Sequence, residues 1–248
     1  HDKKREVNLL KLRETLLNGT FHTSKYDVFT IYEPKEREIY RLPYFPDRIL
    51  HHAIMNVLEP IWVSTFTADT YSCIKNRGIH AAAKKVKQAL REDPEGTTFC
   101  LKLDIRKFYP SINHDVLKSI LRRKLKDKRL LRLLDEIIDS ADGVPIGNYL
   151  SQYFANLYLT YFDHWIKEQK RVKHYFRYAD DIVILASDKS YLHSLMGEIR
   201  AYLGDLKLEV KGNWQVFPVA ARGIDFVGYV FFHTHTRMRK GIKKTFCR

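Results

Sequence analysis

The chain has 248 residues, of which 45% are hydrophobic, 13% aromatic and 29% charged. This composition excludes disordered and collagen-like chains and provides enough apolar side chains for one large core or two cooperating subdomains. Lysine and arginine number 43 against 29 acidic residues, which gives a formal charge of +14. Such a surplus favours a polyanionic partner such as nucleic acid, although charge alone fits a merely soluble basic protein equally well.

No segment approaches 18 consecutive apolar residues, so we expect no membrane-spanning helix and no membrane partner. Residues 1–10 lack the apolar core of a signal peptide. Cys73, Cys100 and Cys247 are far apart in sequence and form no CxxC pair. This pattern argues against a disulfide scaffold or a zinc knuckle and is typical of a cytoplasmic protein.

The hydrophobic pattern predicts an α+β fold with an antiparallel sheet, because strands follow helices without a regular βαβ alternation. We expect helices at 7–17, 48–58, 79–90, 114–138 (one helix or a pair), 150–167 and 191–206. Strands are expected at 97–103, 172–178, 182–186, 208–219 and 224–232. The second and third strands are predicted to form a hairpin with Ala179, Asp180 and Asp181 at its tip.

Basic residues are concentrated in six segments, at 3–5, 35–48, 84–91, 118–132, 167–173 and 237–248. Aromatic side chains accompany two of them, which is typical of nucleic-acid binding because cations follow phosphates and rings stack on bases. The alternative is an ordinary solvated helix face, and the helical spacing of leucines favours that interpretation for 117–138.

Two adjacent carboxylates, Asp180 and Asp181, stand between apolar strands in the sequence FRYADDIVILA. An ordinary hairpin turn is the plain alternative, but paired carboxylates repel each other and favour a site for Mg²⁺, which prefers carboxylate and phosphate oxygens. Asp104 ends another apolar strand and is followed by Ile105, whose carbonyl is a further candidate ligand. If the strands share one antiparallel sheet, Asp104 and Asp180 meet, and two metal ions about 4 Å apart can stabilise an in-line phosphoryl displacement.

Five segments in order resemble those of reverse transcriptases. Asp104 with its trailing aromatics and residues 178–181 (YADD) resemble the two catalytic motifs. Between them, 143–152 (GVPIGNYLSQ) resembles the third polymerase motif. Residues 33–50 resemble the basic fingers segment, and 223–229 (GIDFVGY) resemble the primer grip. The resemblance implies an RNA-directed DNA polymerase with Mg²⁺, or Mn²⁺ as a substitute, that binds an RNA template, a DNA or RNA primer and dNTPs.

The resemblance also implies one reverse transcriptase domain over 1–248, with a right-hand palm-and-fingers architecture. Fingers are expected at about 1–98 and 110–150, and the palm, with its antiparallel sheet, at about 99–109 and 151–240. Because the chain ends soon after the primer-grip segment, the thumb is expected to be absent or truncated.

The roles carried over from the family fall into three groups. The catalytic metals are assigned to Asp104, Asp180 and Asp181, with Ile105 as a further metal ligand. Nucleotide binding is assigned to Lys35, Arg37, Arg41, Arg106, Lys107, Tyr109, Ile146 and Gly147. Contacts with the template and primer are assigned to Ser151, Gln152 and Gly228.

Several of these roles have alternatives. Arg41 could equally contact template, Gly147 could serve only a tight turn, and Ser151 could cap a helix. The Tyr109 ring is expected to block a ribose 2′-OH, which argues against an RNA-templated RNA polymerase. Lys211 is the nearest substitute for the lysine that many relatives place after this region, so the general acid for pyrophosphate stays open.

Within the family, Ile146-Gly147 and Ser151-Gln152 stand where group II intron and retroviral enzymes usually have Gln-Gly and Ser-Pro. This pattern resembles the reverse transcriptases of diversity-generating retroelements, which implies error-prone cDNA synthesis and a small basic accessory protein. The alternatives are a phage-defence enzyme, of abortive-infection or retron-like type, and a nucleic-acid-binding scaffold with a polymerase fold. Retention of all three aspartates argues against the scaffold.

Overall fold

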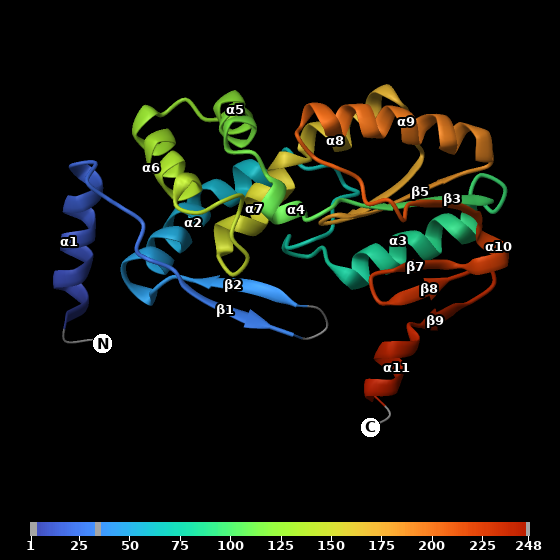
Figure 1. The fold of residues 1–248 in the computed structure, drawn as a ribbon, viewed down its shortest axis with the longest axis horizontal. Helices are drawn as coiled ribbons and strands as arrows, with labels where there is room; N and C mark the ends of the chain where they lie inside the picture. The colour runs from blue at the N-terminus through green and yellow to red at the C-terminus, as the bar shows by residue number, and fades with distance from the viewer. Residues whose placement is uncertain (1–3, 33–35, 247–248) are drawn as a thin grey trace. The chain divides into compact units, whose positions relative to one another are not determined.

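The computed structural model describes residues 4–32 and 36–246, and the chain divides into two compact units (Figure 1). Unit 1 comprises His1–Trp62 and Ile112–Tyr158, and unit 2 comprises Val63–Ser111 and Leu159–Arg248. Each unit is therefore built from two separate stretches of sequence. The assignment of fingers and palm to particular residue ranges stays a prediction. No helix in the described parts of the chain is long and apolar enough to cross a membrane.

Unit 1 combines a two-stranded antiparallel hairpin with helices. Its elements in the described residues are α1 (Arg5–Leu17), β1 (Asp27–Ile31), β2 (Arg37–Arg41), the π-helical turn η2 (Tyr44–Arg48), α2 (Ile49–Val63, all but its last residue), α5 (His114–Lys124), α6 (Lys128–Asp139) and α7 (Tyr149–Tyr158). Helix α7 is the centre of the core, because almost all of its residues are buried. The Trp62 ring of α2 packs against Tyr153 and Phe154 at centroid distances of 6.2 and 5.9 Å.

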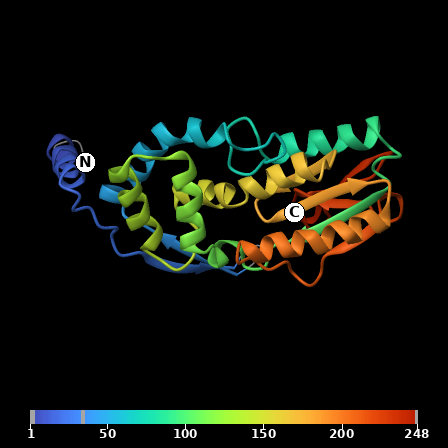
Figure 2. The same ribbon diagram turned by 90° about the horizontal axis from the view of Figure 1, so that it is seen from above.

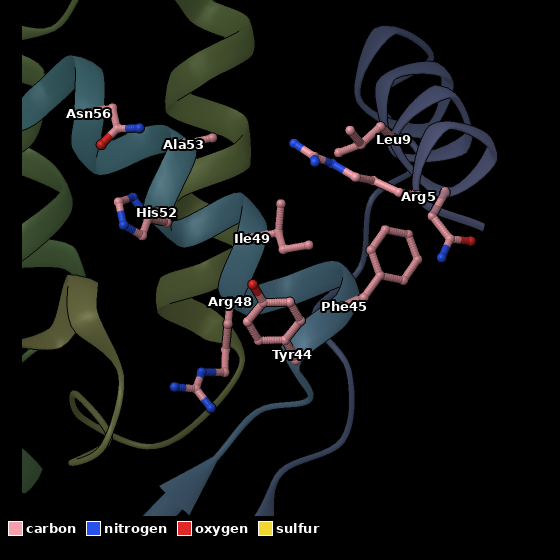
Figure 3. Close-up of a pocket in the computed structure, with 10 residues that line it drawn as sticks. Arg5, Leu9, Tyr44, Phe45, Arg48, Ile49, His52, Ala53 and Asn56 are labelled. Atoms are coloured by element: carbon pink, nitrogen blue, oxygen red, sulfur yellow. The ribbon is translucent and has the colours of Figure 1, made fainter. Parts of the chain in front are cut away.

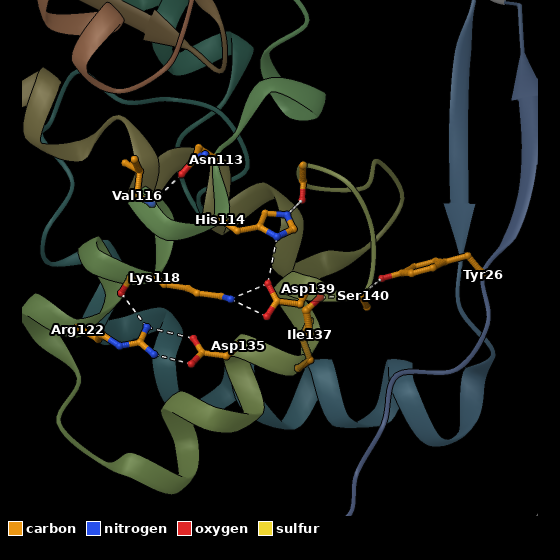
Figure 4. A network of polar contacts seen from close by, with 11 residues as sticks. Tyr26, Asn113, His114, Val116, Lys118, Arg122, Asp135, Ile137, Asp139 and Ser140 are labelled. Atoms are coloured by element: carbon orange, nitrogen blue, oxygen red, sulfur yellow. Dashed lines mark hydrogen bonds and ion pairs between the residues drawn. The ribbon is translucent and has the colours of Figure 1, made fainter.

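Helices α5 and α6 form an antiparallel pair joined by polar contacts (Figure 4). Lys118 Nζ lies 2.6 Å from Asp139 Oδ2, and Arg122 Nη2 contacts Asp135 Oδ2. His114 Nε2 contacts the Gly143 carbonyl at 2.8 Å, which ties α5 to the loop before α7. Asp127 caps α6 by accepting from the amides of Arg129 and Leu130 at 2.8 Å. Of these contacts, the one between His114 and Gly143 connects the helix pair to the loop that carries Ile146 and Gly147.

Unit 2 is built around a four-stranded antiparallel sheet with the order β4-β5-β3-β6. Its strands are β3 (Phe99–Asp104), β4 (His174–Tyr178), β5 (Asp181–Ala186) and β6 (Gln215–Pro218). A second, three-stranded sheet contains β7 (Ile224–Phe226), β8 (Tyr229–Phe231) and β9 (Thr236–Met238). The helical elements are α3 (Ile79–Glu92), α4 (Phe108–Ser111), α8 (Thr160–His164), the π-helical η3 (Trp165–Gln169), α9 (Lys189–Asp205), α10 (Val219–Arg222) and α11 (Lys240–Phe246).

Helices α3 and α9 cover opposite faces of the four-stranded sheet, with the strands between them in both views (Figures 1 and 2). On the α3 face, the hydrophobic core joins Val86 and Leu90 of α3 to Cys100 and Val183 of the sheet and to Phe226 of β7. Alternation along β3 puts Cys100, Lys102 and Asp104 on this same face. This face of β3 therefore carries a buried thiol at Cys100, followed by the charged side chains Lys102 and Asp104 toward the carboxyl end of the strand.

The predicted α+β fold with antiparallel sheets is confirmed, but three predicted elements were wrong. The single helix at 150–167 is instead α7, α8 and η3 in succession, because the regular helix ends at Tyr158. The strand at 208–219 is reduced to β6 and one bridge from Val210 to Ile105. The strand at 224–232 is a hairpin, because Val227 and Gly228 turn the chain with φ of 44° and 89°.

Two further differences concern hairpins. Asp181 is the first residue of β5, so the tip of the β4–β5 hairpin holds only Ala179 and Asp180. The β1–β2 hairpin was not predicted, because its side chains are mostly exposed and lack an apolar-polar alternation. Its pairing runs from Asp27 opposite Arg41 to Ile31 opposite Arg37, and the exposed Arg41–Asp27 ion pair joins the two strands at one end.

Candidate active site

Unit 2 brings the three candidate catalytic aspartates together at one end of its sheet. In the β3–β5 register Asp104 lies opposite Asp181, so the two side chains project on the same face. The Ile105 amide donates to the Asp180 carbonyl at 3.3 Å, which places the β4–β5 tip beside the end of β3. The sequence predicted that Asp104 and Asp180 meet on two strands of one antiparallel sheet. The register instead pairs Asp104 directly with Asp181, and Asp180 lies at the tip next to that pair.

Charge repulsion and burial govern the chemistry of this cluster. Burial, together with the negative charge of Asp104, raises the pKa of Asp180 to about 6. Burial also raises the pKa of Asp181, while the Lys102 ammonium opposes that rise. Lys102 Nζ lies 2.6 Å from Asp181 Oδ1, and Lys211 forms an ion pair with Asp104. Two lysines thus partly neutralise the carboxylates from within the same unit.

The carboxylates suit a hard divalent cation in their chemistry. The donors are oxygen atoms only, and their mutual repulsion at Asp180 is the kind of destabilisation that a bound cation relieves. Among residues 4–32 and 36–246, no group of three or more His, Cys, Asp or Glu side chains is arranged closely enough to form a ready-made metal site. The residue types fit the ion, but lysines contact the oxygens that would ligate it.

The segment after Asp104 supplies three further candidates. The Arg106 amide donates to the Glu209 carbonyl at 2.8 Å, and its guanidinium is 3.0 Å from the Glu209 carboxylate. Lys107 is exposed and adopts a left-handed backbone with φ 44°. Tyr109 lies in α4, where burial, with added effects of Cys73 and Asp180, raises the pKa of its phenol well above the ordinary value. The Tyr109 ring therefore stands near Asp180 as an uncharged group.

Gly228 occupies the turn between β7 and β8, where φ is 89°. Its carbonyl accepts a 2.9 Å hydrogen bond from the Arg239 amide, and a Cβ there would lie 2.9 Å from Ile242 Cδ1. Both the backbone conformation and the neighbouring side chain favour glycine at this position.

The remaining nucleotide candidates in the described residues belong to unit 1. The Tyr40 amide donates to the Ile146 carbonyl at 2.8 Å, which joins β2 to the loop before α7. Gly147 has φ 123°, and a Cβ there would lie 2.8 Å from the Tyr40 carbonyl oxygen. Arg37 and Arg41 are exposed on β2, and Arg41 forms an ion pair with Asp27. Lys35 lies outside the described residues.

The two template candidates on α7 differ in exposure. Ser151 is buried inside the helix, two residues after its start, so the capping alternative is wrong. Gln152 is exposed and lines a cavity of about 450 Å³ with Gly147, Tyr149, Arg48 and His52. A neighbouring pocket of about 540 Å³ lies between Arg5 and Leu9 of α1 and the residues from Tyr44 to Asn56 of η2 and α2 (Figure 3).

Sequence reasoning missed two residues that contact the cluster or its hairpin. Lys102 shares a strand face with Asp104, and its spacing of two residues was a usable signal once the strand was predicted. Asp163, which is buried against Arg177 of β4, had no such signal because its partners come from distant segments.

Comparison with known proteins identifies the family. Residues 33–231 match the family described as "Reverse transcriptase (RNA-dependent DNA polymerase)". The chain therefore belongs to the reverse transcriptase family, and its domain is that of an RNA-directed DNA polymerase, a nucleotidyltransferase. Members of this family generally use divalent metal ions.

Among curated relatives, Protein YkfC of Escherichia coli (strain K12) is 26% identical over 279 residues, which cover 93% of this chain and 73% of that protein. Group II intron-encoded protein LtrA of Lactococcus lactis subsp. cremoris is 23% identical over 178 residues, 66% of this chain and 29% of that protein. The chain thus spans most of the first relative but less than a third of the second.

A structure of telomerase from Candida Tropicalis in complex with a TWJ fragment of telomeric RNA has a TM-score of 0.64 to this chain. The identity is 15%, and the match covers 88% of this chain and 45% of that one. This similarity confirms the polymerase fold that the sequence motifs predicted.

Proposed function

We propose that this chain copies an RNA template into DNA by extending a primer with dNTPs. The observation that carries the proposal is the pairing of Asp104 with Asp181 beside Asp180, in a chain that belongs to the reverse transcriptase family. An RNA template, a DNA or RNA primer and dNTPs are the proposed partners. The net charge of +14 supports binding of these polyanions.

We assign the metal ligands to Asp104, Asp180, Asp181 and the Ile105 carbonyl, with Mg²⁺ as the ion and Mn²⁺ as its substitute. When bound, the ions supply electrostatic stabilisation to a transferring phosphoryl group. The primer 3′-hydroxyl loses its proton to solvent water, its oxygen forms a bond to the α-phosphorus of the dNTP, and the bond from that phosphorus to the bridging oxygen of the β-phosphate breaks, releasing pyrophosphate. The Lys211 ammonium beside Asp104 is the proposed proton donor to that leaving group.

In the same proposal, the uncharged Tyr109 ring excludes a ribose 2′-OH, and Arg106 and Lys107, which are both exposed, contact the triphosphate. Gly228 contacts the primer. In unit 1, Arg37, Arg41, Ile146 and Gly147 are the proposed nucleotide contacts, and Ser151 and Gln152 the proposed template contacts. The burial of Ser151 limits its part to supporting Gln152 from within α7.

Primer extension on a defined RNA template tests the proposal. We expect dNTP-dependent and Mg²⁺-dependent synthesis of complementary DNA by the purified chain. Asp104→Asn is the matched control, because it keeps the side-chain shape and removes a ligand charge, so any synthesis by that variant reports a copurifying polymerase. Equal synthesis by both proteins, or none by the wild-type chain, would contradict the proposal.

We propose in addition that the enzyme belongs to the diversity-generating branch, with error-prone synthesis and a small basic accessory protein. The residues Ile146-Gly147 and Ser151-Gln152 support this branch. The competing assignment is an intron-type enzyme, which the similarity to Group II intron-encoded protein LtrA favours. Sequencing of cDNA made on one template separates them: errors concentrated at template adenines indicate diversification, and an even, low error rate indicates the intron type.

A further inference from the structure

A fully buried ion pair lies behind the candidate catalytic hairpin. Arg177 of β4 and Asp163 of α8 have side chains with 0% exposure. Arg177 Nε and Nη2 donate to the two Asp163 oxygens at 2.8 and 2.6 Å, a bidentate arrangement. Thr70 and Tyr175 hydroxyls donate to the same carboxylate at 2.9 and 2.5 Å. The carboxylate is therefore held by donors from two separate segments of unit 2, the loop at Thr70 and strand β4.

The same guanidinium also reaches the tip of the hairpin. Arg177 Nη1 donates to the Ala179 carbonyl at 3.1 Å, immediately before Asp180. Ala179 has φ 54°, a left-handed conformation that is unfavourable for a residue other than glycine. The main chain of Arg177 is fixed as well, because its amide donates to Asp69 O and its carbonyl accepts from Tyr71 N, both at 3.0 Å.

We propose that Arg177 and Asp163 are positioning residues that hold the Ala179–Asp180 turn in the conformation that presents Asp180 to the metal. This inference rests on the proposed function, which makes Asp180 a metal ligand. Asp163 fixes the guanidinium plane through two of its nitrogens, and the third nitrogen then fixes the turn. Neither residue contacts the reacting atoms, so their effect passes through the turn.

The shape of the arginine side chain is what the arrangement requires. A guanidinium offers a rigid planar fork that binds a carboxylate on one edge and a carbonyl on another, whereas a lysine ammonium is a single point charge. Arg177→Lys keeps a cation against Asp163 but cannot also donate to the Ala179 carbonyl. Tyr175→Phe is the matched control, because it removes one donor from Asp163 and leaves both Arg177 contacts in place.

The test measures three properties of the full chain. Hydrogen exchange of segment 174–186 and Mn²⁺ affinity by electron paramagnetic resonance are measured without template, and kcat and KM are measured in primer extension. For Arg177→Lys we expect faster exchange in that segment, Mn²⁺ affinity weakened about tenfold and kcat lowered about 10- to 100-fold, with KM for dNTP changed little. For Tyr175→Phe we expect a lower melting temperature and wild-type values for Mn²⁺ affinity and kcat.

Ala179→Gly covers the case in which Arg177→Lys does not fold. Glycine adopts the left-handed conformation without strain, so this variant retains stability while the turn gains freedom. We expect unchanged or higher melting temperature together with about threefold weaker Mn²⁺ binding and faster exchange at 174–186.

Different results overturn the two proposals. Wild-type exchange and Mn²⁺ affinity in Arg177→Lys would show that the ion pair only stabilises the fold. Equal losses in Arg177→Lys and Tyr175→Phe would lead to the same conclusion. Faster exchange at 174–186 with unchanged Mn²⁺ affinity in Ala179→Gly would show that the conformation of the turn does not govern metal binding. Absence of polymerisation by the wild-type chain would overturn the proposed function alone, because the exchange and Mn²⁺ measurements do not depend on it.

Discussion

The two hairpins that carry candidate functional residues are built in opposite ways. In β1–β2 most side chains are exposed, and the Arg41–Asp27 ion pair is 62% and 58% exposed. In β4–β5 the central residues are buried, and the Arg177–Asp163 ion pair is completely inaccessible. Exposed charges are screened and adaptable, whereas buried charges are held in one arrangement by their hydrogen bonds.

This difference matches the chemistry proposed for each hairpin. A carboxylate that binds a metal ion must be held within a fraction of an ångström, which a buried network provides. For an arginine that contacts a flexible polyphosphate, a long side chain and a positive charge matter more than a fixed position. The β1–β2 hairpin has one rigid feature of its own, the close approach of Gly147 to the Tyr40 carbonyl.

The most severe effect is expected at the tip of the buried hairpin. Asp180→Asn keeps the side-chain shape and removes a ligand charge, so dNTP incorporation should fall by about three orders of magnitude or more. RNA binding, which depends on lysine and arginine, should persist and weaken steeply with salt. Single-turnover primer extension and a salt titration of RNA binding measure the two effects, and undiminished extension would remove Asp180 from the catalytic assignment.

A substitution of Tyr109, which lies in α4 near Asp180, tests whether this residue selects the sugar of the incoming nucleotide. Tyr109→Ala opens the space of the ring, so the ratio of kcat/KM for dNTP over rNTP should fall by roughly 10- to 100-fold. Tyr109→Phe is the control, because it retains the ring and loses only the hydroxyl. If the ratio is unchanged in Tyr109→Ala, the ring is a packing residue only.

Gly147 tests the close approach between the loop before α7 and the Tyr40 carbonyl. Gly147→Ala introduces a methyl group against the Tyr40 carbonyl at a left-handed φ, and we expect the free energy of unfolding to drop by about 2 kcal/mol. Gly197→Ala in α9 is the matched control, since its Cβ meets no atom within 4 Å and alanine should stabilise the helix by about 0.5–1 kcal/mol. Urea unfolding measures both, and equal effects would exclude a constrained Gly147 turn.

The neighbouring Ile146 is expected to affect accuracy more than activity. Its isoleucine side chain offers only apolar contact, whereas glutamine can hydrogen-bond, so Ile146→Gln should raise discrimination by ~1–2 kcal/mol, roughly 5- to 30-fold in error rate. The effect should be most visible opposite template adenine. Error spectra of cDNA from both proteins on one RNA test this, and coinciding spectra from an active variant would place the source of error elsewhere.

The smallest effect on stability is expected in the exposed hairpin. Arg41→Ala removes a solvent-exposed ion pair with Asp27, so the free energy of unfolding should change by less than about 1 kcal/mol. Arg177→Ala is the contrasting variant, because leaving Asp163 buried without its partner should cost about 3–5 kcal/mol. Similar losses for both variants in urea unfolding would show that the two hairpins are not built differently.

The sequence alone was sufficient for the features that are encoded locally. Apolar runs with turn residues predicted β3 and β5, and helical spacing predicted α3 and α9. The order of five short motifs identified the polymerase family, because each motif combines residue types whose chemistry is explicit in the sequence. The end of β3 at Asp104 followed from the same local pattern.

Other features were decided only by the tertiary structure. Breaks such as the end of α7 at Tyr158 and the β7–β8 turn at Val227-Gly228 interrupt runs that look continuous in sequence, because packing overrides local propensity. The partnership of Asp163 with Arg177 and the ion pairs of Lys102 and Lys211 join residues that are brought close only by the folded sheet and its surroundings. Long-range contacts of this kind depend on strand register and burial, which no single segment of the sequence specifies by itself.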